Sequence, residues 1–293
     1  MSKKKDSKNH SFFDEGKVVL ITGASSGIGK NVALALASSR MKLIIIARRE
    51  NKLMQTARSL NKLKIKNLPI VGDIRNREDR EKIIRYSLKK FGRIDVLINN
   101  AGLGKANLFL EQSSEEIDEL IETNILGLIK MSKLVIPIMK EQNDGHIINI
   151  SSSLALLPVY PFAVYCATKS AVKTFSDCIR EEVKEYGIKV STVLPGPYNT
   201  EFHKVAGLDD SSYTSFTVLK LADKIAKLVK KPKENLIQPW FFIPLVWIAT
   251  RFKFIRRKIT SPIAKSIMEG KIKKERLEFK KKEEAQKITV KIP

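Results

Sequence analysis

Tyr165 and Lys169 stand four residues apart in the stretch Tyr-Cys-Ala-Thr-Lys. On a helix, this spacing puts both side chains on one face with their Cβ atoms about 5–6 Å apart. An ammonium group so near a phenol favours the phenolate, which predicts a Tyr165 pKa lowered from about 10 toward neutrality. Such a tyrosine can exchange a proton with a reacting oxygen. The alternative is an ordinary pair of neighbours on a helix surface.

A glycine-rich turn, TGASSGIG at residues 22–29, lies between a predicted strand and a predicted helix. Its glycines allow a tight turn and let backbone N–H groups approach a pyrophosphate, whose charge the helix N-terminus favours. The spacing G-x-x-x-G-x-G departs from the more common G-x-G-x-x-G fingerprint. We predict a dinucleotide site here, with a purely structural turn as the alternative.

Arg48 and Arg49 follow the second predicted strand. NAD sites usually carry an acidic residue at this place to hold the ribose 2′-hydroxyl. A guanidinium group instead suits a 2′-phosphate in charge and geometry. NADP(H) is therefore favoured over NAD(H). In the alternative interpretation, both arginines are solvated and Glu50 reaches back to the ribose.

Apolar runs bounded by turn residues alternate with helical stretches along most of the chain. This alternation predicts one α/β domain with a doubly wound parallel sheet of about seven strands and helices on both faces. We place this domain at residues 16–238, after a basic tail at 1–15 and before an aromatic and basic extension at 239–293. The predicted strands are 18–21, 43–47, 68–71, 96–98, 147–150 and 190–194, and the longer helices are 28–39, 76–91, 114–140 and 162–186. Pro137 predicts a kink or an early end of the third helix.

Six motifs occur in one order along this domain. They are TGASSGIG at 22–29, Asn-Asn-Ala-Gly at 99–102, Asn124, Ser152, Tyr165 with Lys169, and Pro195-Gly196. Residues 16–238 thereby resemble the short-chain dehydrogenase/reductase family, which has a Rossmann-like fold. The family places its serine about thirteen residues before the tyrosine, which selects Ser152 over Ser151 and Ser153.

The resemblance implies four catalytic residues. Tyr165 would be the general acid or base, and Ser152 would hydrogen-bond the substrate oxygen. Lys169 would bind the nicotinamide ribose and lower the tyrosine pKa, and Asn124 would anchor a water relay to that lysine. Donors at the substrate oxygen would stabilise the charge that hydride transfer builds there.

The resemblance also implies a set of cofactor-binding residues. In it, Asp73 would contact adenine and Thr200 would touch the carboxamide, while Tyr165 and Lys169 belong to the set as well. Its other members are Gly23, Ser25, Ser26, Gly27, Ile28, Gly29, Arg48, Ile74, Asn100, Ala101, Gly102, Pro195 and Gly196. Apolar residues after the serine (Leu154, Leu156, Leu157, Val159 and Tyr160) would border the substrate pocket, with residues 201–217 as its lid.

The net charge of +23 is concentrated at the two ends of the chain. Residues 1–10 carry four lysines and one aspartate, and residues 251–293 carry 15 basic and 5 acidic side chains. Such tails suit lipid headgroups or nucleic acid without affecting the fold; a plain lysine bias is the alternative. The two cysteines and three histidines show no metal-ligand spacing, so we predict no metal site and reduced thiols.

The segment 236–249 holds both tryptophans and runs into a cluster of arginines and lysines. It is too short to span a bilayer, which takes about 20 residues. Aromatic residues beside cations suit an element lying in the interface of an anionic membrane. In the alternative interpretation, 236–238 are the last strand and the aromatics cap the pocket or pack on a partner subunit.

The sequence therefore predicts an NADP(H)-dependent oxidoreductase that moves a hydride between the nicotinamide and a carbonyl or alcohol. An apolar substrate is favoured, such as an acyl, sphingoid or steroid-like ketone. The resemblance implies a homodimer or homotetramer formed by the two long helices. We expect the protein on the cytoplasmic side, with peripheral membrane contact through its extension, because no apolar segment follows the lysine-rich start. The alternatives are a nucleic-acid-associated protein, which lacks supporting motifs, and a membrane scaffold that keeps the fold.

Overall fold

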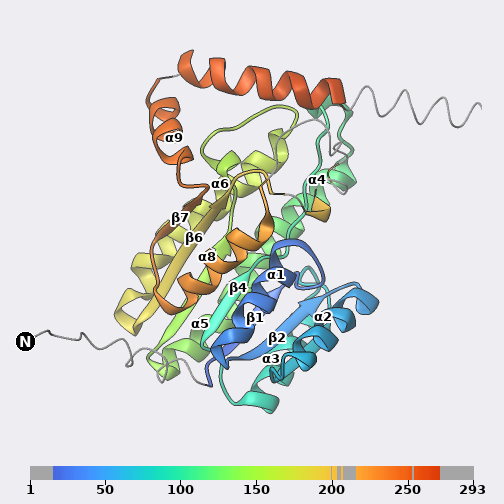
Figure 1. Ribbon diagram of the computed structural model, residues 1–293, viewed down its shortest axis with the longest axis vertical. Coiled ribbons are helices and arrows are strands. Elements are labelled where there is room, and N and C mark those ends of the chain that lie inside the picture. Colours follow the sequence, from blue (N-terminus) through green and yellow to red (C-terminus); the bar gives the residue numbers. More distant parts are fainter. Residues whose placement is uncertain (1–15, 199, 203–205, 207–215, 253, 271–293) are drawn as a thin grey trace, which may run out of the picture.

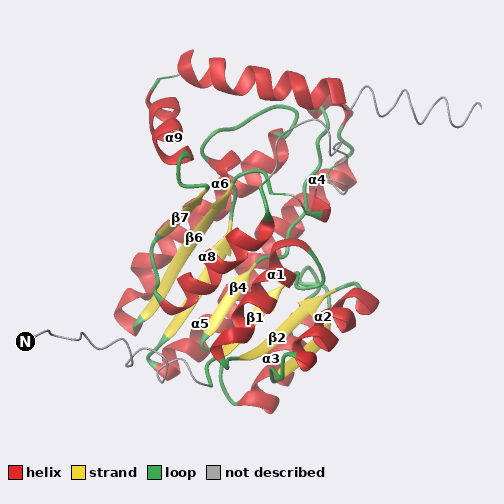
Figure 2. Ribbon diagram, in the orientation of Figure 1, coloured by secondary structure: helices red, strands yellow, loops and turns green. Residues whose placement is uncertain are grey.

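A single parallel sheet of seven strands forms the centre of the molecule, with the order β3-β2-β1-β4-β5-β6-β7. The computed structural model describes residues 16–198, 200–202, 206, 216–252 and 254–270. The predicted doubly wound α/β fold is thus confirmed (Figure 2). The strands are β1 Val18–Thr22, β2 Lys42–Ala47, β3 Asn67–Val71, β4 Val96–Asn99, β5 Gly145–Ile150, β6 Ile188–Pro195 and β7 Asn235–Gln238.

Helices cover both faces of the sheet (Figure 1). Val19 and Ile21 of β1 pack in one buried cluster with α1, α2 and α8, while Val18 and Leu20 pack in another with α3, α5 and α6. Alternate residues of a strand point to opposite faces, so a strand buried on both sides must be apolar throughout. The helices are α1 Gly27–Ala35, α2 Glu50–Lys62, α3 Arg77–Phe91, α4 Ser114–Ile121, α5 Leu128–Gln142, α6 Ala163–Val183, α8 Val218–Lys230 and α9 Phe242–Arg251.

The helix predicted at 114–140 is three pieces in the structure. A π-helical turn, Glu122–Gly127, separates α4 from α5. Pro137 does not end α5 early, because the helix runs on to Gln142. Val135 and Met139, on either side of the proline, are buried against the sheet and hold this part of the helix in place.

The chain completes the sheet with the last strand that the alternative interpretation placed at 236–238, since β7 pairs with β6. It continues as α9 and as a helix over residues 254–270, which lie together at one end of the molecule (Figure 1). Among the described residues, no helix is long and apolar enough to cross a membrane. The predicted basic tail at 1–15, most of the predicted lid at 201–217 and residues 271–293 lie outside the described residues.

Candidate active site

A cavity of about 750 Å³ lies at the carboxyl ends of the strands. The strand order reverses between β1 and β4, and such a switch point is where open α/β sheets bind their ligands. All the predicted site residues except Gly29 and Asn124 line this cavity. The motifs that are scattered along the sequence therefore meet at one place.

The glycine-rich turn fits closely against the loop after β4. A Cβ on Gly23 would lie 2.8 Å from Ala101 Cα, and a Cβ on Gly29 would collide with the Asn100 amide. Gly23 and Gly27 also have positive φ angles, of 68° and 53°. The turn thus requires glycines, and it exposes backbone at the start of α1, where a pyrophosphate fits. Gly29 lies behind the cavity wall and keeps the two loops close together.

Arg49 forms a polar cluster with the glycine-rich turn and the segment after β6. Its guanidinium donates to Ser26 Oγ at 2.7 Å and to Ser25 Oγ at 3.3 Å. It also donates to a carboxylate oxygen of Glu201 at 2.9 Å, and Lys52 Nζ lies 2.6 Å from the other carboxylate oxygen. Hydrogen bonds from Lys52 and Arg49 lower the pKa of Glu201 to about 2. Where β1 and β2 end, the cavity therefore carries the Arg49 guanidinium, the hydroxyls of Ser25 and Ser26, and the Glu201 carboxylate.

Arg48 has a different environment from Arg49, although both line the cavity. Its guanidinium lies 3.6 Å from Asp73 and 3.7 Å from Glu119. Asp73 also accepts two hydrogen bonds from the Arg75 guanidinium, at 2.7 and 2.9 Å. Burial acts to raise the Asp73 pKa, but the hydrogen bonds from Arg75 outweigh it and hold the pKa below its usual range. Arg48 thus lies beside two carboxylates, whereas the Arg49 guanidinium is shared between the Glu201 carboxylate and the serine hydroxyls.

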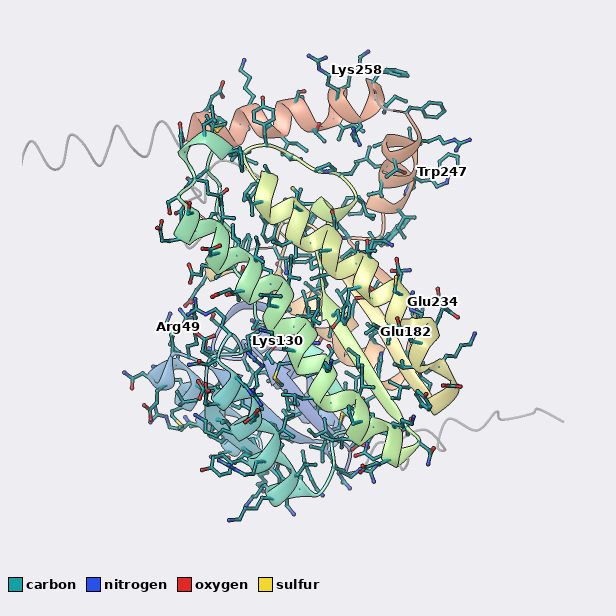
Figure 3. The ribbon with its side chains drawn as sticks, turned by 180° about the vertical axis from the view of Figure 1, so that it is seen from behind. Arg49, Lys130, Glu182, Glu234, Trp247 and Lys258 are labelled. Atoms are coloured by element: carbon teal, nitrogen blue, oxygen red, sulfur yellow. The ribbon has the colours of Figure 1, made fainter. Side chains whose placement is uncertain are left out.

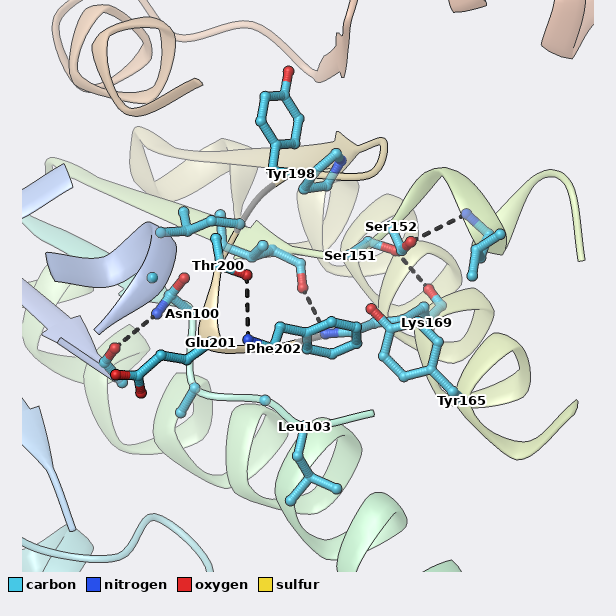
Figure 4. A pocket seen from close by; sticks show the side chains of 18 of the residues that line it. Asn100, Leu103, Ser151, Ser152, Tyr165, Lys169, Tyr198, Thr200, Glu201 and Phe202 are labelled. Atoms are coloured by element: carbon cyan, nitrogen blue, oxygen red, sulfur yellow. Dashed lines mark hydrogen bonds between the residues drawn. The ribbon is translucent and has the colours of Figure 1, made fainter. Parts of the chain in front are cut away.

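Ser152, Tyr165 and Lys169 lie together and are buried (Figure 4). Tyr165 and Lys169 occupy one face of α6, as their spacing predicts, and Lys169 Nζ lies 5.7 Å from the centre of the Tyr165 ring. The ammonium group donates to the Ile150 carbonyl at 3.0 Å, at the end of β5. This contact holds the ammonium at the edge of the sheet, beside the cavity.

The prediction that the Tyr165 pKa is lowered toward neutrality is wrong for this structure. Burial raises the pKa of Tyr165, and a hydrogen bond with Ser152 counteracts only part of that rise. Burial also lowers the pKa of Lys169 to about 8. A low-dielectric site disfavours both charged forms, and spacing along a helix does not reveal this. Tyr165 is consequently a protonated phenol at neutral pH.

Asn124 lies behind Lys169 in the π-helical turn. Its amide donates to the Leu103 carbonyl at 2.9 Å and to Thr168 Oγ1 at 3.1 Å, and its oxygen accepts from Leu103 N at 2.9 Å. A Cβ on Gly102 would lie 3.0 Å from the Asn124 oxygen and 3.2 Å from Lys169 Nζ. Asn124 and Lys169 therefore approach each other across Gly102. Such π turns often occur at functional sites.

The wall around Tyr165 is largely apolar. The Phe202 ring lies 5.4 Å from the Tyr165 ring, centre to centre, and fills the space next to Gly104. Of the residues predicted to border a pocket after the serine, Leu154, Leu157 and Val159 do so, whereas Leu156 and Tyr160 are not among the lining residues. The sequence prediction missed Leu245, Ile259, Ile263 and Ile267, which belong to the C-terminal helices and also line the cavity.

The chain matches the family model of the short chain dehydrogenases over residues 17–210. It belongs to the short-chain dehydrogenases. This family assignment confirms the resemblance drawn from the motifs. Among the described residues, no cluster of three or more histidine, cysteine, aspartate or glutamate side chains could hold a metal ion.

Several known dehydrogenases and reductases are similar to this chain. An NADP-dependent 3-hydroxy acid dehydrogenase of Schizosaccharomyces pombe is 37% identical over 194 residues, which are 65% of this chain and 75% of that protein. A short-chain dehydrogenase from Sphingobium yanoikuyae in complex with NADPH is 30% identical with a TM-score of 0.73, covering 84% of this chain and 95% of the other. A 3-ketoacyl-(acyl-carrier-protein) reductase from Brucella melitensis, complexed with NADH, is 27% identical with a TM-score of 0.70, covering 76% and 97%.

Proposed function

We propose that this short-chain dehydrogenase is an NADP(H)-dependent oxidoreductase that converts an apolar carbonyl compound and its alcohol into one another. The observation that carries the proposal is the meeting of Ser152, Tyr165 and Lys169 with the glycine-rich turn in one cavity. The nicotinamide, when bound, supplies or accepts the hydride. The protein has to bind both reactants, exclude water and handle one proton.

In the direction of reduction, Tyr165 acts as the general acid. Burial keeps its phenol protonated, so its hydroxyl can donate to a carbonyl oxygen as negative charge builds there. Ser152 supplies a second donor to the same oxygen, which stabilises the transition state more than the uncharged ketone. Lys169 carries a positive charge that stabilises the resulting tyrosinate, and it also binds the nicotinamide ribose. Asn124 positions Lys169 through a water relay.

The preference for NADP(H) rests on Arg49 and Ser26. Together they offer a guanidinium and a hydroxyl beside the end of β2, a combination that suits a phosphate dianion, and arginines stand where NAD sites usually carry the acid. Arg48 adds a second positive charge. The NADP-dependent relative from Schizosaccharomyces pombe and the NADPH complex from Sphingobium yanoikuyae agree with this choice. Asp73 and Ile74 would border the adenine of the cofactor, and Thr200 would contact its carboxamide.

The wall around Tyr165 supports the proposed substrate class. Leu157, Phe162, Phe202, Ile259 and Ile263 contribute to an apolar lining. Within the described lining, Lys169 is the only cation on this side of the cavity, because Arg48 and Arg49 lie at the end of β2. A free 3-hydroxy acid, as named for the yeast relative, would bring a carboxylate that no further cation of the described lining meets. A neutral acyl, sphingoid or steroid-like ketone fits better.

We also propose that the enzyme works as a homodimer or homotetramer at the cytoplasmic face of an anionic membrane. The long helices α5 and α6 would form the subunit interface, as the family resemblance implies. The unequal distribution of charge and aromatic residues supports the membrane contact, since both gather in the C-terminal extension.

Following NADPH oxidation with a panel of neutral ketones and of 3-oxo acids tests this function. We expect turnover of apolar ketones, and Tyr165→Phe should lower it by about 10²–10⁴-fold because the proton donor is lost. NADPH binding, measured by nicotinamide fluorescence, should remain in that variant. Unchanged turnover in Tyr165→Phe, or reduction of none of the carbonyl compounds, would contradict the proposal.

A further inference from the structure

Large apolar side chains are exposed on the C-terminal helices. Trp240, Trp247 and Phe254 expose 69%, 68% and 64% of their surface, respectively. Ile243 and Phe252, in or next to α9, are exposed as well. Single exposed apolar residues are ordinary, but a group on two consecutive helices indicates a surface that binds something apolar. We call these five residues the aromatic face.

Cations accompany the aromatic face. Arg251, Arg257 and Lys258 are exposed, and within the described part of the chain no carboxylate forms an ion pair with any of them. The only acidic residue in the ranges 239–252 and 254–270 is Glu269, which pairs with Lys265 at 3.9 Å. Trp247 and Lys258 lie at the same end of the molecule (Figure 3). This surface is therefore both aromatic and positively charged.

The inner sides of the same helices belong to the active-site cavity. Val246 and Ala249 of α9 pack against Leu157, which follows the catalytic serine in the chain. Ala264 and Ile267 belong to the same buried cluster as Tyr165. The helices thus form one wall of the cavity in which Tyr165 lies.

Two residues that line the cavity are exposed on the same helices as the aromatic face. Ile263 lines the cavity and yet exposes 46% of its surface, and Leu245 combines lining and exposure in the same way. A substrate that enters beside these two residues passes from the aromatic face to Tyr165 along apolar side chains. The charged cofactor end of the cavity lies elsewhere, at Arg49 and the glycine-rich turn.

We propose that the aromatic face and its cations dock on an anionic lipid bilayer, and that the mouth at Leu245 and Ile263 opens into the lipid. The substrate is then a carbonyl lipid that leaves the bilayer without crossing water. This substrate assignment rests on the proposed function, whereas the docking does not. Tryptophan and arginine side chains suit the headgroup region, where an apolar body and a polar end are both solvated.

A second copy of the chain would cover this surface less well than a bilayer. A symmetric contact would bring Arg251, Arg257 and Lys258 of two copies together, and among the described residues 239–252 and 254–270 the sole carboxylate, Glu269, already pairs with Lys265. Like charges brought together in this way oppose association. Anionic headgroups instead supply the missing counter-charges.

Tryptophan fluorescence of the full chain tests the docking. Both tryptophans of the protein, Trp240 and Trp247, lie on the aromatic face, so the whole signal reports on it. We expect vesicles of phosphatidylcholine with phosphatidylserine to shift the emission to the blue, and brominated lipids to quench it. Pure phosphatidylcholine should give a much smaller change, and added salt should reverse most of the effect. Emission that is insensitive to both kinds of vesicle would overturn the proposal.

Charge neutralisation gives the matched test. Arg257→Gln with Lys258→Gln should weaken the partition into anionic vesicles about thirtyfold, from about 1 kcal/mol per basic residue near the surface. Lys89 and Lys90, two adjacent exposed lysines of α3, serve as the control. Changing both to Gln should leave the partition into vesicles unchanged. If both double variants lost the same amount of vesicle binding, the effect would be one of net charge alone. That result would overturn the proposal that the aromatic face docks on the bilayer.

Replacing Trp247 tests two points, the apolar contribution to membrane binding and a second copy of the chain as the alternative partner. Trp247→Ser should weaken flotation with vesicles, whereas Leu63→Ser, at another exposed apolar side chain in the domain, should not. Sedimentation of the wild type without lipid should give the same subunit number as Trp247→Ser. The opposite result would be a wild-type oligomer that already shields the tryptophans and that Trp247→Ser dissociates. It would assign the aromatic face to a second copy of the chain and overturn the proposal.

Turnover separates this inference from the proposed function. With a water-soluble ketone and no lipid, Arg257→Gln/Lys258→Gln should match the wild type. With a long-chain ketone dissolved in anionic vesicles, the same variant should be much slower. Normal docking with no reductase activity would overturn the proposed function alone. Equal rates of wild type and variant on the vesicle-bound ketone would overturn the lipid-facing mouth alone.

Discussion

The Glu201 carboxylate lies 2.9 Å from the Arg49 guanidinium, and this contact joins the segment after β6 to the end of β2 across the cofactor side of the cavity. Lys52 reaches the same carboxylate at 2.6 Å. The low pKa of Glu201, about 2, keeps its charge negative at physiological pH. A permanent negative charge therefore stands next to the guanidinium to which we assign the 2′-phosphate.

Replacing Glu201 with Gln should improve the discrimination in favour of NADPH. Removing one negative charge near a phosphate is worth about 1 kcal/mol for charges about 4 Å apart in water, or about fivefold in the ratio of the NADH and NADPH dissociation constants. NADH is the internal control, because any loosening of the segment affects both cofactors. Glu81→Gln, which removes an exposed ion pair with Arg77, should leave the ratio unchanged. A ratio that falls in Glu201→Gln would show that the carboxylate mainly positions Arg49.

Replacing Arg49 with Gln should have the opposite effect on the same ratio. The lost charge-assisted hydrogen bonds are worth about 1.5–3 kcal/mol, which weakens NADPH binding about 10- to 150-fold. NADH binding should change little. Arg48→Gln should cost less, since the contacts of Arg48 are with Asp73 and Glu119, away from the serine hydroxyls that Arg49 reaches. A larger loss in Arg48→Gln than in Arg49→Gln would reverse the assignment. Titration calorimetry with both cofactors measures these ratios without turnover.

Local patterns predict most of the fold and the membership of the cavity. Strands buried on both faces must be apolar throughout, so the runs at β1, β2 and β5 identify themselves in the sequence. The glycines at Gly23 and Gly27 mark a turn that no other residue type fits well. Helices α2 and α8 are not among the longer helices that the sequence predicts. α2 places few large apolar residues on its buried side, whereas α8 has an apolar face at helical spacing that sequence reasoning could have found.

Features that depend on tertiary packing could not be predicted from spacing. The raised pKa of Tyr165 comes from burial by Phe162, Phe202 and residues of the C-terminal helices, which are up to about a hundred positions away in the chain. The contact of Glu201 with Arg49 joins residues 152 positions apart. The aromatic segment 236–249 allows two interpretations, membrane contact or a cap on the pocket or a partner subunit. The structure shows that the C-terminal helices contribute to the cavity wall. Sequence alone does not say which side of such a helix faces inward.

The rate of ketone reduction should fall as the pH rises through about 8. Burial lowers the Lys169 pKa to about 8, so its charge is present below that pH and is lost above it. The tyrosinate formed after proton donation then lacks its stabilising cation. Lys169→Arg should be slower at every pH because its shape differs, but its rate should not fall near pH 8, since a guanidinium stays charged. NADPH affinity measured over the same range separates binding from chemistry. A fall at pH 8 that persists in Lys169→Arg would assign it to another group.

His146 should make the protein less stable in mild acid. Its ring is buried in β5, with Nε2 2.8 Å from Ser191 Oγ, and burial together with Lys189 and Lys17 lowers its pKa to about 3. The unfolded chain takes up a proton below its ordinary value of 6.5, while the folded protein does not do so until about pH 3. The free energy of unfolding should therefore decrease as the pH falls between these values, by up to about 1.4 kcal/mol per pH unit. Urea denaturation of the wild type and His146→Gln over this range measures the effect. Because the carboxylates titrate in both proteins, their contribution cancels in the difference. A difference that does not vary with pH would mean that the folded protein accommodates a charged His146.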